Sequence, residues 1–459
     1  MRRNWAGPGL CAAGGVICLG AAAVWCSFLE RGGWLDRLGV SAAMLVFAAL
    51  AALLLRAEQV ARNRLLVMLL PIGAAILARA LCLDYAGTDY LQFLTKWYQT
   101  FQENGGFRAI AMDIGDYNVP YLYFMAAISY LPVPDLYLIK LFSILFDVIL
   151  AWGGFRLVRT VCREAGKEAE IVPLVAFAVL LLLPTVVLNS AYWAQCDAVY
   201  GGLVLHAVAQ ALAGKNKSSV ALLAVAFSFK LQTVFVLPLW GLLWFIRRVK
   251  FRQLLVFPGV YLLTAVPALL LGKPLGDILG VYFDQAGQYP QLTANAPSVY
   301  QYLPNGMYST GNWYALVGIA AAAVVVLVLL IAGVLLGRRL DRRALLAMAV
   351  VMAAAIPWLL PHMHERYFFL ADVLSVCLAC VCLRAIPAAV LICGTSLASY
   401  RVFLRLKFNC YLTIGGVGYG MPVEATCMLA GVICAAVVLV QELRCCAGTE
   451  RKEGGARLC

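Results

Sequence analysis

Apolar stretches of about 20 residues recur along the whole chain, and they limit the possible fold more than any other feature. A run such as 313–336 is long and apolar enough to cross a bilayer as one helix. The composition agrees, because 63% of the 459 residues are hydrophobic and only 13% are charged, whereas a soluble domain is about a quarter charged. We therefore predict an all-α, polytopic membrane protein.

The apolar stretches predict about fourteen spans. Residues 1–64 form two extra N-terminal helices, 65–386 form a core, and 387–459 form C-terminal helices and a tail. Within the core, long outer loops are expected at 84–135 and 273–312. The predicted spans are 10–29, 38–55, 65–83, 136–158, 171–188, 198–213, 219–231, 232–246, 253–272, 313–336, 344–360, 367–386, 387–400 and 421–441.

Segment 120–132 decides the orientation. It is apolar but short, with a proline at each end, which is typical of a helix lying flat at the interface. If it does not cross, most of the 36 Lys and Arg residues fall on the side of the N-terminus. The positive-inside rule then predicts a cell-membrane protein with both termini in the cytoplasm. The same rule explains the net charge of +13 better than a nucleic-acid partner does.

Polar residues gather at three turns that this topology places on the outer side. Charged groups at membrane depth are costly and usually functional, so we predict a polar cavity that opens outward. The first turn carries Lys230, the second carries Asn189, Gln195 and Asp197, and the third carries His362, His364, Glu365 and Arg366.

Each of these residues also has a simpler interpretation. Lys230 could reach the lipid headgroups as an ordinary interfacial lysine. The two neighbouring histidines and the carboxylate beside them could bind a divalent metal, although the lack of a third histidine weakens that hypothesis. Lys140, Asp147 and Asp372 are expected to be structural ion-pair partners.

A cavity with cations and a carboxylate suits one chemistry in particular. Lys and Arg can hold a lipid phosphate, and a nearby carboxylate can take a proton from a hydroxyl. Together they predict glycosyl transfer from a polyprenyl-phosphate sugar. The phosphate leaving group needs charge stabilisation rather than protonation, so no cofactor or metal is strictly required.

Five stretches, in chain order, carry a resemblance that agrees with this chemistry. Through them the sequence resembles the GT-C superfamily of polytopic glycosyltransferases, which use polyprenyl- or dolichyl-phosphate sugars. It is most similar to bacterial GPI-mannosyltransferase-II-like proteins. The stretches are "GTDYLQFLTKWYQTFQENGGFRAI" (87–110), 115–147, "YWAQCDAVYGGLVL" (192–205), "AFSFKLQTVFVLPL" (226–239) and "PHMHERYFFLADVLS" (361–375).

The resemblance implies a GT-C-type bundle with interfacial helices in the first outer loop. It also implies that Asp89 of "TDYLQF" is the general base, with Asp84 and Asp116 as the other candidates. The reaction would move mannose or glucose, with inversion, to a hydroxyl of a glycan, lipid or protein on the outer face. The sequence more distantly resembles the dolichyl-phosphate-glucose-dependent glucosyltransferases of N-glycan assembly. Cys196 and Asp197 depart from the pattern of those enzymes, which puts any role of Asp197 in doubt.

The resemblance assigns the remaining polar residues to the donor phosphate or to supporting roles. The "HER" at 364–366 resembles the family's "HEK", and Lys230 matches its "FK" motif. Lys230, His362, His364 and Arg366 are thus expected at the phosphate, and Glu365 is expected to orient His362, His364 and Arg366. Gln195, Asp197, Asp116 and Tyr121 are expected to support the site.

The main alternative is a multi-pass transporter or flippase of a lipid-linked or anionic substrate. Transporters often have repeated halves and helices broken near the midplane. The sequence indicates neither feature, so the transferase is the preferred interpretation.

Overall fold

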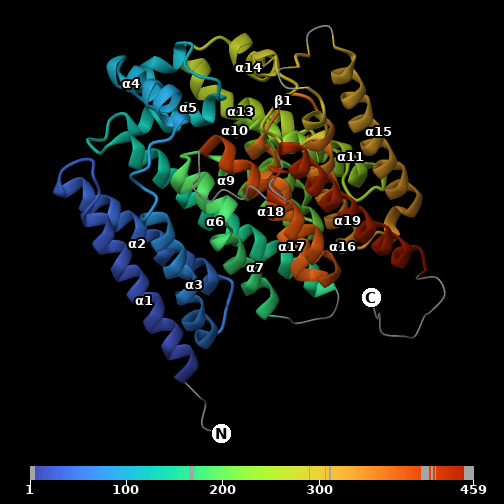
Figure 1. Cartoon of the computed structure of the whole chain (residues 1–459), viewed down its shortest axis with the longest axis horizontal. Coiled ribbons are helices and arrows are strands. Elements are labelled where there is room, and N and C mark those ends of the chain that lie inside the picture. The colour runs from blue at the N-terminus through green and yellow to red at the C-terminus, as the bar shows by residue number, and fades with distance from the viewer. Residues whose placement is uncertain are drawn as a thin grey trace.

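A computed structural model describes residues 6–164, 170–288, 290–304, 307–309, 312–404, 413–414, 417–418 and 420–448. In these residues the chain is almost entirely helical (Figure 1). The helices are α1 (Ala6–Ser27), α2 (Trp34–Ala57), α3 (Arg62–Ala80), α4 (Thr95–Glu103), α5 (Val119–Ile128), α6 (Asp135–Glu164), α7 (Ile171–Leu182), α8 (Pro184–Val187), α9 (Asp197–Leu212), α10 (Asn216–Phe229), α11 (Leu237–Phe245), α12 (Phe251–Leu254), α13 (Val256–Leu270), α14 (Leu275–Gln288), α15 (Trp313–Leu336), α16 (Arg342–Leu359), α17 (Phe369–Val381), α18 (Ile386–Leu404) and α19 (Met421–Gly448).

Short segments of other geometry connect these helices. Two are π-helical, η1 (Tyr90–Leu94) and η3 (Leu188–Tyr192). The 3-10 segments are η2 (Gly106–Ala111), η4 (Leu231–Val236), η5 (Val299–Tyr302), η6 (Gly337–Arg339), η7 (Glu365–Phe368) and η8 (Leu383–Ala385). The strands are β1 (Thr293–Ala294), β2 (Met363–His364), β3 (Thr413–Ile414) and β4 (Val417–Gly418).

Nine helices in the described part of the chain are long and apolar enough to cross a membrane, or ten if the bent pair α7 and α8 forms one span. The protein is therefore a multi-pass membrane protein, but the expected number of about fourteen spans is not confirmed. Four expected spans coincide with shorter helices. Helix α9 has 16 residues, α10 has 14, α17 has 13 and α11 has 9.

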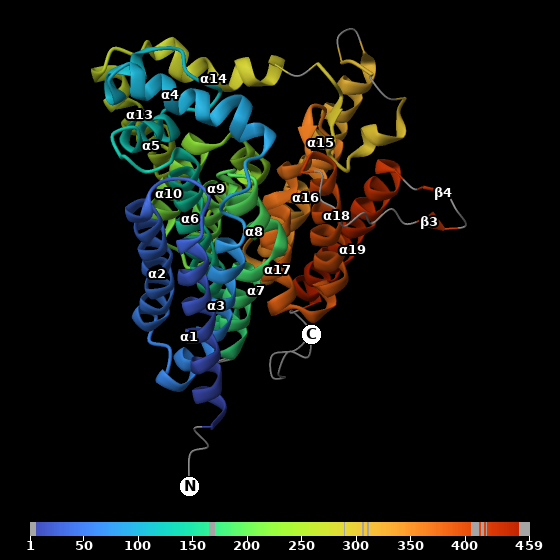
Figure 2. The same cartoon turned by 60° about the vertical axis from the view of Figure 1, so that its left-hand side comes forward.

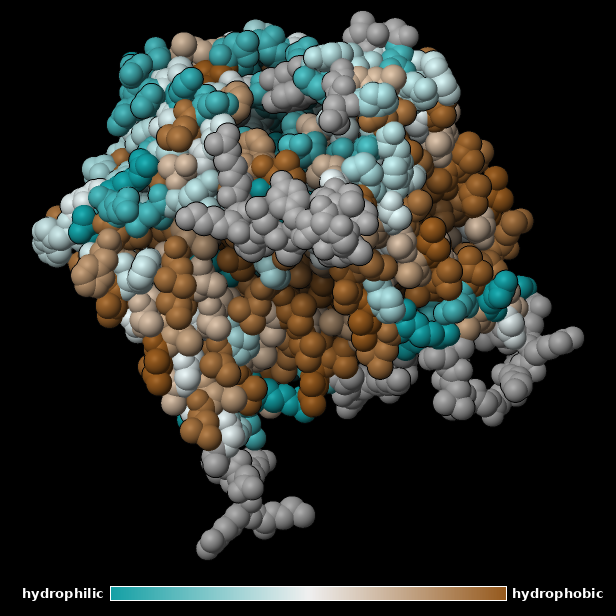
Figure 3. Space-filling view, in the orientation of Figure 1, coloured by the Kyte–Doolittle hydropathy of each residue, from teal (hydrophilic) through white to brown (hydrophobic). Residues whose placement is uncertain are grey.

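The long helices stand side by side, and Figure 2 shows α4 and α14 lying across one end of them. Helix α1 begins, and α19 ends, toward the opposite end of the bundle. On the face in view, Figure 3 shows a hydrophobic band across the upright helices below a more hydrophilic upper part. Apolar side chains such as Leu270 and Leu335 are largely exposed, because lipid rather than water covers such a band.

Helix α5 occupies the segment that was expected to lie flat. Asn118 begins it by accepting a hydrogen bond from the Val119 amide at 2.7 Å, and Pro120 occupies an early position where no backbone donor is needed. Tyr123 ties α5 to α13, since its hydroxyl donates to the Thr264 carbonyl at 2.9 Å. With ten residues, α5 is too short to cross a bilayer.

Several helices break at the end where α4 and α14 lie; the sequence predicted turns there but not the bend between α7 and α8. Helices α7 and α8 meet at 45° because Pro184 cannot continue the helix. Helix α10 ends at Lys230, whose backbone is extended. Between α16 and α17, β2 pairs in parallel with β1 of the second long loop, so that Thr293 lies opposite Met363. These breaks replace continuous helix with turns, and the turns carry the polar residues.

Candidate functional site

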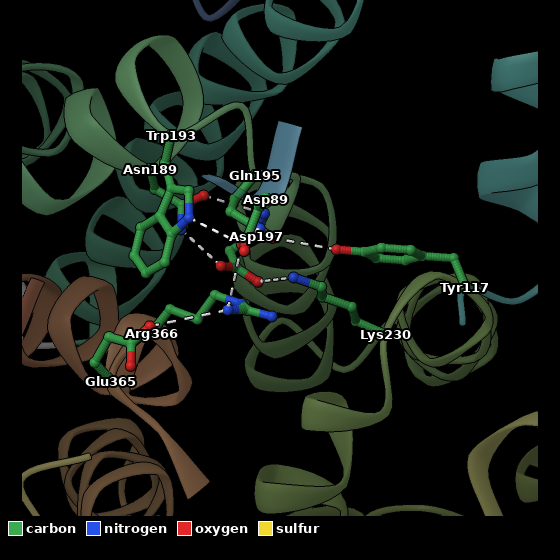
Figure 4. A network of polar contacts seen from close by, with 9 residues as sticks. All are labelled: Asp89, Tyr117, Asn189, Trp193, Gln195, Asp197, Lys230, Glu365 and Arg366. Carbon is green, nitrogen blue, oxygen red and sulfur yellow. Dashed lines mark hydrogen bonds and ion pairs between the residues drawn. The ribbon is translucent and has the colours of Figure 1, made fainter. Parts of the chain in front are cut away.

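Asp89 lies at the start of η1, and two side chains from one distant turn hold its carboxylate. Oδ2 accepts hydrogen bonds from Trp193 Nε1 at 2.9 Å and from Gln195 Nε2 at 2.6 Å (Figure 4). The Asp89 side chain remains 15% exposed. One oxygen is thus fixed by two donors, and the carboxylate is still accessible.

Arg366 approaches the same carboxylate from η7. Its Nη1 lies 3.8 Å from Asp89 Oδ2 and 3.9 Å from Glu365 Oε1. The guanidinium carbon lies 5.5 Å from the centre of the Trp193 ring, within the range of a cation–π contact. Trp193 therefore contacts both the carboxylate and the cation.

Lys230 and Asp197 form a second ion pair next to the first (Figure 4). Asn189 fixes the aspartate, because its Nδ2 donates to Asp197 Oδ2 at 2.6 Å and its Oδ1 accepts from the Asp197 amide at 3.2 Å. The Lys230 ammonium lies 5.5 Å from the centre of the Tyr117 ring. The Tyr117 hydroxyl donates to Gln195 Oε1 at 3.1 Å and thereby links the two ion pairs.

The structure brings most of the expected site residues into one polar network. Each cation in it contacts a carboxylate, so positive and negative side chains alternate within the network and are not separated on two sides of it. The expected residues found together are Asp89, Gln195, Asp197, Lys230, Glu365 and Arg366.

Glu365 is buried, and neither of its carboxylate oxygens has a hydrogen-bond partner in the described structure. Loss of solvation raises its pKa to about 7, although the neighbouring Arg366 partly opposes that shift. Of the three residues that Glu365 was expected to orient, it forms no hydrogen bond with His362 or His364 in the described structure. Arg366 is the residue that it contacts.

The two expected histidines lie in different surroundings. His362 has a left-handed backbone (φ 64°) and contacts the second long loop, where its Nδ1 lies 2.8 Å from the Gln291 carbonyl. His364 lies in β2, and burial together with the charges of Arg366 and Lys230 lowers its pKa to about 3. His364 is therefore neutral at pH 7 and could contact a phosphate by a hydrogen bond, not as a cation.

Asp89 is the acidic residue of the first outer loop that lies in the network. Asp84 has a structural role, because it accepts hydrogen bonds from the Tyr137 hydroxyl at 2.5 Å and from the Glu30 amide at 3.1 Å. Asp116 is not among the residues drawn in Figure 4, and its backbone carbonyl accepts a hydrogen bond from Gln285.

Tyr121 supports the site by packing. It is buried, and its ring lies 4.4 Å from that of Tyr117 and 5.6 Å from that of Phe124. Its contact with Tyr117 helps to place the ring that faces Lys230.

A buried ion pair anchors the turn that carries Trp193 and Gln195. Arg79 Nε donates to Asp147 Oδ2 at 2.7 Å, which confirms the expected structural role of Asp147. Ser190 of η3 donates to the same oxygen. Lys140 differs from its expected role, because its ammonium donates to three backbone carbonyls at 2.7–2.9 Å.

Sequence reasoning missed Trp193 and Tyr117 as site residues. Both are aromatic residues in a chain rich in them, and each contacts a cation through its ring and donates a hydrogen bond to a residue far away in sequence. The stretch 189–200 was recognised as polar, but its aromatic members could not be assigned partners before the fold was known.

No group of three or more His, Cys, Asp and Glu residues suitable for a metal ion occurs among the described residues. The sequence matches no model of a known protein family and no curated protein.

Proposed function

We propose that this protein is an integral membrane glycosyltransferase that moves mannose or glucose from a polyprenyl-phosphate donor to an acceptor hydroxyl. The observation that carries the proposal is the Asp89 carboxylate, which two donors orient and which lies 3.8 Å from the Arg366 guanidinium. An oriented, accessible carboxylate beside a cation can act as a general base next to an anionic leaving group.

In the proposed step, the acceptor oxygen attacks the anomeric carbon of the sugar. The bond between that carbon and the phosphate oxygen breaks, and the phosphate keeps the electron pair. Asp89 takes the hydroxyl proton. One direct displacement inverts the anomeric carbon, and all atoms and charges balance without a metal or cofactor.

The contact between Asp89 and Arg366 connects proton transfer to phosphate stabilisation. When Asp89 becomes protonated, its attraction for Arg366 weakens, and the guanidinium can neutralise the charge that develops on the phosphate. Lys230 is held beside this position by Asp197 and supplies a second cation. Neutral His364 could donate a hydrogen bond to the same phosphate.

The proposal includes a membrane arrangement. We place the site on the outer face of the cell membrane, both termini in the cytoplasm, and α4 and α5 along the interface of a GT-C-type bundle of about fourteen helices. The position of α4 and α14 across the end of the bundle where the helices break supports this arrangement (Figure 2). The acceptor would be a glycan, lipid or protein that reaches this face.

One observation favours transport or lipid flipping as a second candidate. Helices α7 and α8 meet at 45°, and transporters often bind substrates at broken helices. The break leads into η3 and then to Trp193, so the same site would bind the transported anion.

The test is transfer of radiolabelled sugar from polyprenyl-phosphate mannose or polyprenyl-phosphate glucose by purified protein in lipid nanodiscs, with membrane extract as acceptor. Wild type, Asp89→Asn, the matched variant Asp116→Asn and an EDTA-treated sample are compared. We expect transfer by wild type and Asp116→Asn, a loss of about 10²- to 10⁴-fold in Asp89→Asn, and no effect of EDTA. If folded wild type transfers neither sugar but moves a lipid-linked donor across vesicles, the second candidate replaces the first.

A further inference from the structure

An arginine-lined cavity lies at the end of the bundle opposite the site. Helix α9 runs from Asp197 at the site to Leu212 at the cavity, a length of about 24 Å. The cavity has a volume of about 410 Å³, which is within the range of ligand sites. Gly214, Asn216, Arg247, Arg248 and Arg338 line it. We call it the arginine cavity.

Two helix ends of the same geometry form part of its wall. After α9, the Gly214 amide (φ 75°) donates to the Ala211 carbonyl, and the Lys215 amide donates to Gln210. After α11, the Arg247 amide (φ 59°) donates to Trp244, and the Arg248 amide donates to Leu243. Both are Schellman caps, in which glycine is the favoured left-handed residue.

The second cap carries an arginine where the backbone favours glycine. A side chain in the left-handed conformation costs free energy that glycine avoids. Arg247 therefore occupies a left-handed position that glycine would adopt at lower cost.

Arg248 forms a fixed part of the cavity. Its Nη2 donates to the Arg338 carbonyl at 3.0 Å and to the Leu340 carbonyl. Asn216 Nδ2 donates to the Arg248 carbonyl at 2.7 Å. The side chains of Arg247 and Arg338 are exposed beside this rigid base.

The charge around the cavity is strongly positive. The sequence has no Asp or Glu between residues 198 and 276. Asp341 is the acidic residue of the α15–α16 connection, and its Oδ1 caps α16 by accepting from the Ala344 amide at 2.8 Å. A ligand in this cavity is therefore expected to be an anion.

Exposed aromatic and aliphatic side chains lie within three residues, in sequence, of the arginines that line the cavity. Trp244, adjacent to the cap, contacts Phe245 and Phe251, with ring centres 4.9 and 5.8 Å away, and all three rings are exposed. Leu335 near the end of α15 is 80% exposed. Aromatic rings beside exposed aliphatic surface are typical of the headgroup level of a membrane protein.

We propose that the arginine cavity binds the headgroup of an anionic phospholipid. Arg247 and Arg338 would hold the phosphodiester by charge-assisted hydrogen bonds, and the acyl chains would lie against the exposed apolar side chains that neighbour these arginines in the chain. A site for free phosphate would not need such apolar side chains.

The experiment titrates purified full-length protein in detergent with phosphatidylglycerol against phosphatidylcholine, and native mass spectrometry counts the retained lipids. The double variant Arg247→Gly with Arg338→Gln removes two charges, and glycine suits the left-handed backbone at its position. Its matched control, Lys217→Gln with Arg252→Gln, removes two exposed charges that do not line the cavity. Arg338→Gln alone is the second variant.

We expect phosphatidylglycerol binding to weaken about 30-fold in the double variant and about fivefold in Arg338→Gln, with little change in the control. Equal weakening in the test and control variants would overturn the proposal, because general surface charge would then explain binding. Equal retention of phosphatidylcholine by wild type would overturn it too. Thermal stabilisation of wild type by inorganic phosphate, to the same extent as by phosphatidylglycerol, would assign the cavity to free phosphate instead.

Discussion

Trp193 donates its indole N–H to Oδ2 of Asp89 across 2.9 Å, although 104 residues separate the two in sequence. The indole ring also packs against Tyr400 and Phe403, with ring centres 5.2 and 5.0 Å away. Asp89 is thus oriented by a side chain that is itself fixed on its other faces. A pre-oriented carboxylate is what a general base requires.

Trp193→Phe should separate this hydrogen bond from the packing. Phenylalanine keeps an aromatic ring against Tyr400 and Phe403 but lacks the N–H donor. A hydrogen bond to a charged group contributes about 1.5–3 kcal/mol, so kcat/KM for sugar transfer should fall about 10- to 100-fold. The melting temperature in detergent should change little. Unchanged turnover would show that Gln195 alone orients Asp89.

Lys230 should have a structural role and a separate role in turnover. Lys230→Met leaves Asp197 buried without its cation, which should cost about 3–5 kcal/mol of unfolding free energy. Adding Asp197→Asn removes the unpaired charge, so melting temperature should recover in the double variant. Turnover should not recover, because the phosphate still lacks the Lys230 cation. If both the melting temperature and the turnover recovered, Lys230 would have a structural role and no role in turnover.

The buried pair of Arg79 and Asp147 should contribute strongly to stability. Their side chains are 1% and 0% exposed, so Asp147→Asn would leave a buried guanidinium without its counter-ion. We expect a loss of about 3–5 kcal/mol in denaturant unfolding. The matched control is Glu170→Gln, which breaks an ion pair with Arg64 whose side chains are 63% and 37% exposed. That change should cost at most about 1 kcal/mol, and equal losses would contradict the prediction.

Glu365 should make stability depend on pH between about 4.5 and about 7. Its pKa is raised from 4.5 to about 7, mainly by burial, so the folded protein binds its proton more tightly than the unfolded chain. Protonation of Glu365 therefore stabilises the folded state. This contribution to the free energy of unfolding is fully present below pH 4.5 and is lost as the pH rises to about 7.

Glu365→Gln keeps the shape of the side chain without its titration. The stability of the variant relative to wild type should therefore increase as pH rises from about 4.5 to about 7, and then become constant. The pKa shift of Glu365 corresponds to a change of at most about 3 kcal/mol in the free energy of unfolding. The measurement is the difference in melting temperature between the two proteins across this range. A difference that does not vary with pH would mean that Glu365 titrates normally.

The membrane class of the fold could be predicted from sequence, because apolar runs such as 313–336 can satisfy their backbone groups in lipid as helices. The number of membrane spans could not be predicted in this way. Length and hydropathy do not reveal that Pro184 bends one helix, or that the helices on either side of the predicted turn at Lys230 are as short as 14 and 9 residues. Such breaks depend on tertiary contacts that supply partners for the backbone groups released by the break.

The chemically unusual residues can be recognised from the sequence. A lysine, an arginine and several carboxylates stand out in an apolar chain because their burial is costly without partners. Their partners, however, follow from how the chain folds. Folding joined Asp89 to Trp193 and Gln195, paired Lys230 with Asp197, and left both Glu365 oxygens without a hydrogen bond in the described structure. These contacts join segments far apart in the chain, and local patterns of hydropathy and charge cannot specify which distant segments pack together.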